Sequence, residues 1–135
     1  MRDPRPGIPW SLRRWQRRVD YAAWMSSPDW LERRRAWLKR WTRWHGSEPT
    51  CQICGKAWSL RDGALHHRSY QRLGHEADRD LVPLCRQPCH QQLHRILESN
   101  PAWLKAGRPH ATDTIIALLR TERQEGGKRV HDRAN

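Results

Sequence analysis

Four of the chain's eight histidines form two short-spaced pairs that suit metal binding. His90 and His94 are four residues apart on a helix that we expect to begin near Pro88, so both imidazoles point from one face. This is the spacing of metal ligands. His66 and His67 end an expected short strand, in which neighbouring side chains point in different directions. One can therefore bind an ion while the other addresses a water molecule. The alternative for each single histidine is a surface residue or a hydrogen-bonded core residue.

The four cysteines form a second pattern. Cys51 and Cys54 are separated by two residues, and Cys85 and Cys89 follow later in the chain. Two such pairs predict a four-thiolate zinc site, which stabilises the fold and leaves no position for substrate. The spacing between Cys85 and Cys89 is one residue longer than usual. His90 in place of Cys89 is therefore an alternative fourth ligand. The four residues could instead be ordinary buried cysteines or form two disulfides, although a reducing cytosol disfavours disulfides.

The charge balance indicates the class of partner. The 135 residues include 26 Lys and Arg against 14 Asp and Glu, a formal net charge of +12. Such an excess favours a polyanion, and we expect DNA. We find no apolar run of about 18 residues, and the first ten residues contain charges and prolines where a signal peptide needs an apolar stretch. We therefore expect a cytoplasmic protein with no membrane partner.

One helix is clearly delimited by its capping residues. Ser27-Pro28-Asp29 predicts its start and Gly46 its end. After Trp30, apolar residues at helical spacing are expected to pack in the core: Leu31, Trp37, Leu38, Trp41 and Trp44. The other face is basic, and it is either simply solvated or grips phosphates. Its residues are Arg33, Arg35, Lys39, Arg40 and Arg43.

The length favours one compact domain. Residues 1–26 are expected to form a basic N-terminal arm and a short helix, and residues 27–123 a single domain with its core at 49–97. After a break at Asn100-Pro101, a short amphipathic helix with Ile115, Ile116, Leu118 and Leu119 is expected to cover the core. Residues 124–135 are expected to be a mobile tail.

Several stretches taken together resemble the HNH endonucleases, a branch of the ββα-metal nucleases. They are Cys51-Gln-Ile-Cys54-Gly55, the run from Leu65-His66-His67 to Gly74-His75-Glu76, the run from Asp80 to Cys85, and Cys89-His90 with His94. The resemblance covers roughly residues 27 to 97. It implies a small α+β fold: a ββα-metal core held by the four-cysteine zinc site, with helices flanking it at both ends. It also implies two antiparallel strands and a loop from Tyr70 to Asp78.

The resemblance also implies roles for single residues. His67 would be the general base that takes a proton from the attacking water, and His66, His90 and His94 would bind the catalytic ion. We expect Mg²⁺ or Mn²⁺ there, although three imidazoles can also hold Zn²⁺ or Ni²⁺. In the loop, Arg68 and Arg72 join the DNA-binding candidates. Arg72 either contacts the scissile phosphate or is an ordinary solvated arginine.

Asp80 departs from the family pattern. The family's middle letter is an asparagine that ties the loop to the motif, and Asp80 stands at the corresponding position. An ionised carboxylate accepts hydrogen bonds but cannot donate them. Three possibilities stay open: the loop is held in another way, Asp80 approaches the metal as a catalytic residue, or activity is reduced.

The sequence as a whole predicts a metal-dependent endonuclease that nicks or cuts DNA, leaving 5′-phosphate and 3′-hydroxyl ends. The runner-up is a zinc-bearing DNA-binding module of the same fold with weak or no catalysis. A third hypothesis is a structural zinc protein with a protein partner, which leaves the net charge of +12 without a role.

Overall fold

Helix α2 (Pro28–His45) has the capping groups that its sequence predicts. The Ser27 hydroxyl accepts a hydrogen bond from the backbone N–H of Trp30 at 3.1 Å, and Pro28 occupies the first turn. Gly46 ends the helix with a φ of 71°, and its N–H donates to the Thr42 carbonyl at 2.9 Å. Glycine adopts positive φ without the steric cost that a side chain brings. The predicted start and end of this helix are confirmed.

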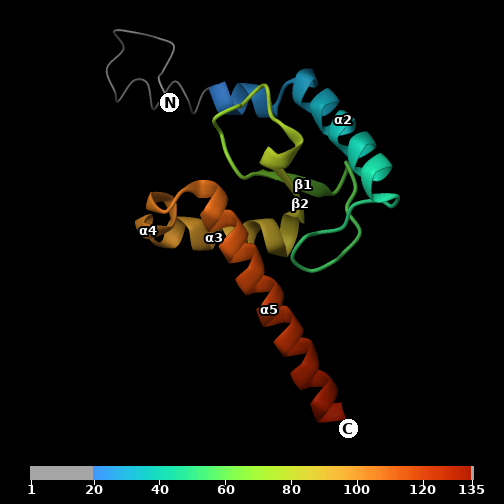
Figure 1. Cartoon of the computed structure of the whole chain (residues 1–135), viewed down its shortest axis with the longest axis vertical. Helices are drawn as coiled ribbons and strands as arrows, with labels where there is room; N and C mark the ends of the chain where they lie inside the picture. The colour runs from blue at the N-terminus through green and yellow to red at the C-terminus, as the bar shows by residue number, and fades with distance from the viewer. Residues whose placement is uncertain (1–19, 135) are drawn as a thin grey trace.

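The computed structural model describes residues 20–134, with side chains through residue 126. The arm expected at residues 1–14 and the first part of the helix expected at 15–25 lie outside the described residues, while residues 20–25 are helical. The α+β class is confirmed (Figure 1). After α2 come β1 (Gly63–His67), η1 (Asp78–Asp80), β2 (Leu81–Cys85), η2 (Arg86–His90), α3 (Gln91–Ser99), α4 (Pro101–Lys105) and α5 (Arg108–Ala134).

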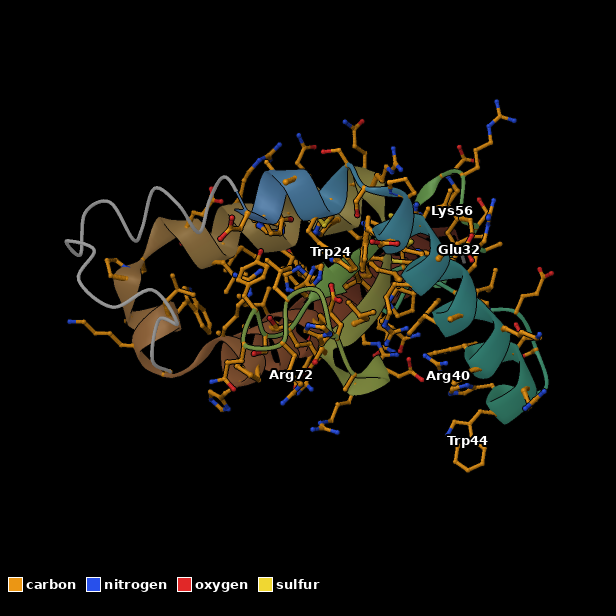
Figure 2. All side chains as sticks on the ribbon, turned by 90° about the horizontal axis from the view of Figure 1, so that it is seen from above. Trp24, Glu32, Arg40, Trp44, Lys56 and Arg72 are labelled. Atoms are coloured by element: carbon orange, nitrogen blue, oxygen red, sulfur yellow. The ribbon has the colours of Figure 1, made fainter. Side chains whose placement is uncertain are left out.

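The apolar face of α2 is shorter than predicted. Trp30 and Trp37 are buried, and Leu38 and Trp41 pack beside them. The core prediction is wrong for Leu31, which is 39% exposed, and for Trp44, which is 88% exposed. Leu31 follows Trp30 directly and therefore lies about 100° around the helix from it. Trp44 is two turns beyond Trp37, and Figure 2 shows its indole projecting away from the rest of the molecule.

Strands β1 and β2 form an antiparallel pair that separates two clusters of core residues. The register runs from Gly63 opposite Cys85 to His67 opposite Leu81. One cluster, here called the tryptophan cluster, consists of Trp30, Trp37, Trp58, Leu65 and Leu81. The other, here called the helical cluster, joins the sheet to α3 and α5 and includes Val82, Leu84, Leu93, Leu97, Ile115 and Ile116.

Alternation along β1 sends its two histidines to opposite faces of the sheet. His66 is opposite Val82 in the register and lies on the side of the helical cluster, whereas His67 is opposite Leu81 and lies on the side of the tryptophan cluster. Both imidazoles are buried. The expectation that adjacent histidines point in different directions therefore holds at this strand end.

Helix α5 closes the helical cluster and then leaves the body of the molecule. Ile115, Ile116 and Leu119 are buried as predicted, but Leu118 is 56% exposed. The sequence predicted a short helix here and a tail from residue 124, whereas α5 continues to Ala134 and extends well away from the sheet (Figure 1). Among the described residues, no helix combines the length and the apolar character needed to cross a membrane.

Candidate metal centres and active site

The four cysteines converge at one end of the sheet. Cys51 and Cys54 come from the loop before β1, Cys85 ends β2, and Cys89 lies in η2. Gly55 lets this loop turn, with a φ of 77° and an N–H that donates to the Cys51 carbonyl at 2.9 Å. All four sulfur atoms lie within 4.8 Å of one another. The two predicted pairs therefore meet in space.

The sulfur geometry fits one tetrahedral zinc ion better than disulfides. All four cysteines are free, and the Sγ atoms of Cys54 and Cys85 are 3.9 Å apart. Zn–S bonds of about 2.3 Å in a tetrahedron place sulfur atoms about 3.8 Å apart, whereas a disulfide needs about 2.05 Å. The fourth member of the group is Cys89, while His90 belongs to a separate cluster.

The surroundings of the cysteine group affect how readily the thiols ionise. Burial raises the pKa of Cys89 and of Cys85 above the ordinary value. For Cys51 burial acts in the same direction, but hydrogen bonds from backbone N–H groups outweigh it and bring the pKa to about 7. From α5, the Arg123 guanidinium donates to Cys89 Sγ at 3.5 Å. A cation placed there favours the anionic thiolates that a zinc ion requires.

Three histidines form the second group. His66 comes from β1, His90 from η2 and His94 from α3. One nitrogen of each lies within 4.8 Å of the others, and the Nε2 atoms of His90 and His94 are 3.0 Å apart. Two imidazole nitrogens bound to one tetrahedral ion at about 2.0–2.1 Å are roughly 3.3 Å apart. The group can therefore hold a metal ion after a small adjustment.

His66 supplies an independent sign that this group suits a metal. Its ring is 1% exposed, and its Nε2 lies 3.1 Å from the hydroxyl oxygen of Thr112. Its Nδ1 is buried without a hydrogen-bond partner among the described residues. Buried polar atoms are nearly always satisfied. An unpartnered buried nitrogen on one of the three clustered rings is consistent with a group that could hold a metal ion.

The electrostatic setting keeps these imidazoles neutral. Burial, followed by the positive charge of Arg108 and neighbouring histidines, lowers the pKa of His66 to about 2. Burial and the neighbouring His94 lower the pKa of His90 to about 4, and burial and Arg108 also lower the pKa of His94. A neutral imidazole offers the lone pair that a metal needs. At neutral pH the three rings are therefore ready to act as ligands.

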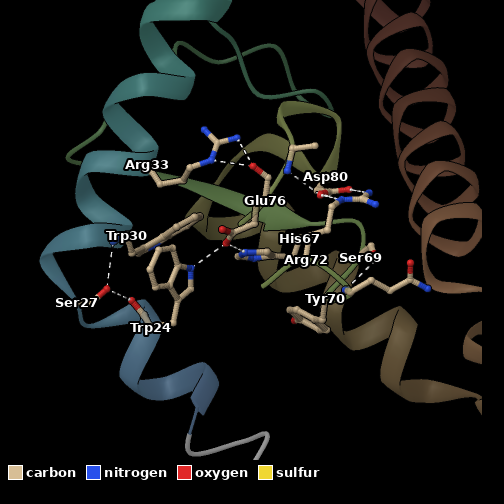
Figure 3. A network of polar contacts seen from close by, with 12 residues as sticks. Trp24, Ser27, Trp30, Arg33, His67, Ser69, Tyr70, Arg72, Glu76 and Asp80 are labelled. Atoms are coloured by element: carbon tan, nitrogen blue, oxygen red, sulfur yellow. Dashed lines mark hydrogen bonds and ion pairs between the residues drawn. The ribbon is translucent and has the colours of Figure 1, made fainter. Parts of the chain in front are cut away.

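His67 lies beside this group without belonging to it. Its Nε2 is 2.7 Å from Oε2 of Glu76, and Trp30 stacks on its ring with centroids 5.1 Å apart (Figure 3). A cavity of about 300 Å³ is lined by His67 and by the three histidines of the metal group. The structure thus places the expected base and the expected ligands around one space.

Asp80 lies in a different place from the histidine group. Its carboxylate accepts two hydrogen bonds from Arg72, at 2.8 and 2.5 Å, and one from the Ala77 backbone N–H at 2.9 Å. The Asp80 carbonyl accepts from the Arg68 N–H at 2.7 Å. Asp80 therefore ties the loop to the start of β2 through hydrogen bonds that it accepts, and it does not belong to the histidine group, so the expectation that it approaches the metal is not supported by this arrangement.

Most of the predicted DNA-binding arginines have acidic partners. Arg33 and Arg40 both bind Asp78, and Arg33 also donates to the Glu76 carbonyl, which leaves its side chain only 14% exposed. The other pairs are Arg35 with Glu32, Arg68 with Asp113 and Arg72 with Asp80. Lys39 and Arg43 are exposed on α2. The basic face of α2 is thus partly occupied by the loop between the strands.

Sequence reasoning missed several residues that contact the side chains or backbone of cavity-lining residues. Arg108, at the start of α5, donates to the His67 carbonyl at 2.9 Å and to the Tyr70 hydroxyl at 3.0 Å. Thr112 supports His66, and Glu76 was assigned only to loop shape. These contacts join residues 9 to 46 positions apart. No local spacing indicates them, because they exist only once α5 and the loop pack on the sheet.

Comparison of the chain with protein-family models, with curated proteins and with solved structures finds no match.

Proposed function

We propose that this chain is a metal-dependent endonuclease of the HNH type that hydrolyses DNA phosphodiester bonds and leaves 5′-phosphate and 3′-hydroxyl ends. The observation that carries the proposal is the meeting of the two histidine pairs around one cavity: three rings whose nitrogens converge, and a fourth ring beside them. In this proposal β1, β2 and α3 form a ββα-metal core.

The chemistry required is attack of water on phosphorus. His67 takes one proton from the water as its oxygen bonds to phosphorus, the bond to the 3′ oxygen breaks, and that oxygen takes a proton from solvent. An imidazole is suited to accept a proton near neutral pH. A divalent ion held by His66, His90 and His94 would stabilise the charge on the phosphate and on the leaving oxygen. Three neutral imidazoles suit Zn²⁺ or Ni²⁺, whereas Mg²⁺ and Mn²⁺ favour oxygen ligands and would need water or phosphate oxygens to complete their coordination.

Positive charge around the cavity supports an anionic substrate. Arg34 and Arg86 line the cavity together with the histidines. Burial is the main cause that lowers the pKa of Arg34, and the positive charge of the neighbouring Arg86 adds to it. Arg108 lies beside His67 and Tyr70. A phosphate in the cavity would relieve this repulsion, and electrostatic contact with phosphates supplies most of non-specific DNA affinity.

The cysteine group has a scaffolding role in this proposal. Cys85 and Cys89 flank the turn that carries the chain from β2 to His90, so an ion held by the four thiolates would position that histidine. A site closed by four sulfur ligands leaves no position for substrate. Hydrolysis is therefore assigned to the imidazole site alone.

Supercoiled plasmid tests the proposal. With Mn²⁺ or Mg²⁺, the wild type should convert it to relaxed or linear DNA, while His67→Ala should cleave about 10²- to 10⁴-fold more slowly, the range for loss of a general base. Glu48→Ala, a change at an exposed position, is the matched control. Cleavage should be absent when the zinc-loaded protein is given no further divalent ion, and it should appear when Mn²⁺ or Mg²⁺ is added.

The competing proposal is a zinc-bearing DNA-binding module without catalysis. It is favoured by one observation, the use of Asp80 where the family has asparagine, with the carboxylate fully engaged by Arg72 and Ala77. The same plasmid assay separates the two proposals. DNA binding with no cleavage in Mg²⁺, Mn²⁺, Zn²⁺ or Ni²⁺ would favour the module.

A further inference from the structure

We propose that Glu76 is the positioning residue for His67: its carboxylate holds the Nε2 proton and so makes Nδ1 the nitrogen that accepts the proton of the attacking water. The catalytic meaning of this inference rests on the proposed nuclease function. Glu76 lies in the loop between β1 and β2, nine residues after His67. The structure supports the assignment through the contact itself, through the residues that hold Glu76, and through the burial of the pair.

The contact is short and shielded from water. His67 Nε2 and Glu76 Oε2 are 2.7 Å apart, and the two side chains are 2% and 0% exposed. Burial by itself raises the pKa of Glu76, but hydrogen bonds from His67, from a backbone N–H and from Trp24 outweigh it, and the pKa lies below its usual value. An ionised carboxylate only accepts hydrogen bonds. In this contact Nε2 is therefore the donor, and a ring with a single proton has its lone pair on Nδ1.

Glu76 is held from two further directions (Figure 3). The Trp24 indole N–H donates to the same Oε2 at 2.8 Å. On the backbone side, the Arg33 guanidinium donates twice to the Glu76 carbonyl, at 3.0 and 2.7 Å. These partners come from the helical residues 20–25 and from α2, so the carboxylate has a fixed place relative to the sheet. A carboxylate that is itself fixed can fix the ring that it binds.

The aromatic residues around the His67 ring do not determine which of its two nitrogens carries the proton. Trp30 stacks on the His67 ring at an interplanar angle of 29°, and the Tyr70 ring lies 5.4 Å away. Aromatic neighbours set the plane of an imidazole but do not distinguish Nδ1 from Nε2. The hydrogen bond to Glu76 makes that distinction. The ring so oriented lines the cavity that it shares with the metal group.

The second carboxylate oxygen argues against a purely structural glutamate. Oε1 of Glu76 is buried without a hydrogen-bond partner among the described residues. An unpaired buried oxygen of a charged group costs free energy, and such atoms in native proteins call for an explanation. An apolar residue of similar size would fill this space without that cost. A carboxylate kept in this position despite that cost fits a role as the anionic partner of His67, which its other oxygen, Oε2, contacts.

The first test is spectroscopic and does not depend on cleavage. In the zinc-loaded 135-residue chain labelled with ¹⁵N, long-range correlations should show His67 Nε2 protonated and Nδ1 unprotonated, with the Nε2–H proton at low field because a carboxylate accepts it. The low-field proton should vanish in Glu76→Ala. In Glu76→Gln, whose amide oxygen can still accept, it should persist at higher field. The opposite tautomer in the wild type, or an unchanged proton in Glu76→Ala, overturns the inference.

The second test separates positioning from binding. Glu76→Ala should lower kcat about 10²-fold, at the lower end of the range for a general base that is no longer aligned, with KM within about two-fold of wild type. Glu76→Gln should recover part of the loss, and Glu48→Ala should match wild type. Thermal unfolding of each variant identifies any that fails to fold, and Glu76→Gln, which keeps the side chain's shape, is the variant expected to fold.

The outcomes distinguish this inference from the proposed function. A wild type that cuts DNA while Glu76→Ala cuts it equally well overturns the inference alone. A wild type that shows the low-field proton but cuts no DNA overturns the proposed function, and the catalytic role of Glu76 with it.

Discussion

His66 Nε2 lies 3.1 Å from the hydroxyl oxygen of Thr112, and this contact leaves His66 Nδ1 buried without a partner among the described residues. This strand histidine is thus held at one nitrogen by α5, and its ring lies beside those of His90 and His94, with centroids 5.5 and 5.2 Å away. Partners of this kind orient metal ligands in many proteins. Through this contact, α5 supports one of the three histidines that are proposed to bind the catalytic ion.

Thr112→Val should weaken metal binding at the imidazole site about 10- to 100-fold, because the isosteric side chain cannot bond Nε2 and the ring loses its fixed orientation. Thr112→Ser keeps the hydroxyl and is the matched control. Competition with a chromophoric chelator measures the affinity. Equal affinity in the valine and serine variants would show that Thr112 contributes only packing.

Loss of the zinc ion proposed for the four-cysteine site should unfold much of the chain. The described body of the protein is small, and this ion would link the loop before β1 to η2. Cys85→Ser, or a strong chelator, should lower Tm sharply or abolish the cooperative transition. Metal analysis should find two ions in the wild type and one in a His90→Ala/His94→Ala variant that keeps its fold. A metal-free chain with an unchanged Tm would contradict the zinc assignment.

Asp80 should make stability depend on pH. Hydrogen bonding from Arg72 outweighs burial and holds the pKa of Asp80 below its usual value. A carboxyl whose folded pKa is lowered adds stability above its unfolded value near 4 and loses it as pH falls through the folded value. At pH 7 the wild type should therefore have a higher urea midpoint than Asp80→Asn. The difference between the two midpoints should shrink as the pH falls below about 4. A gap of constant size from pH 7 to pH 3 would argue against this ion pair.

Gly63→Ala should destabilise the fold by about 1–3 kcal/mol, the usual cost of overpacking. A Cβ at Gly63 would lie 2.2 Å from Nε1 of Trp58, and that indole is held by its hydrogen bond to the Ala64 carbonyl at 2.8 Å. Gly126→Ala, where nothing lies within 4 Å in α5, should instead be neutral or gain about 0.5–1 kcal/mol. Chemical denaturation measures both variants, and equal stability of the two would contradict the predicted clash.

Lys39 and Arg43 are two exposed members of the basic face of α2, whereas its exposed residues Arg35 and Arg40 form ion pairs with carboxylates. Joint replacement of Lys39 and Arg43 by alanine should reduce DNA affinity. If each contacts a phosphate, the slope of log affinity against log salt should fall by about two. Lys105→Ala/Arg120→Ala removes the same charge at other exposed positions and is the control. Fluorescence anisotropy at several salt concentrations gives the slopes, and identical slopes for the two double variants would assign DNA contact to another surface.

Local spacing in the sequence was sufficient for the features that depend on near neighbours. Ser27 and Gly46 delimit α2 through bonds to residues three and four positions away. The two-residue gap between Cys51 and Cys54 and the four-residue spacing of His90 and His94 likewise bring ligands together within a turn of loop or helix. The members of each short-spaced pair were therefore predictable from local spacing, whereas the meeting of the pairs in space depends on how the strands, η2 and α3 pack together.

Tertiary packing alone decided what surrounds those ligands. Thr112 and Arg108 reach the strand histidines from α5, 46 and 41 residues along the chain, and Glu76 meets Trp24 across 52. Packing also placed Trp44 in solvent and turned Arg33 toward the loop. The physical reason is that a spacing of three or four residues specifies direction on one element, whereas hydrogen-bond partners, burial and charge pairing depend on which distant element lies against it.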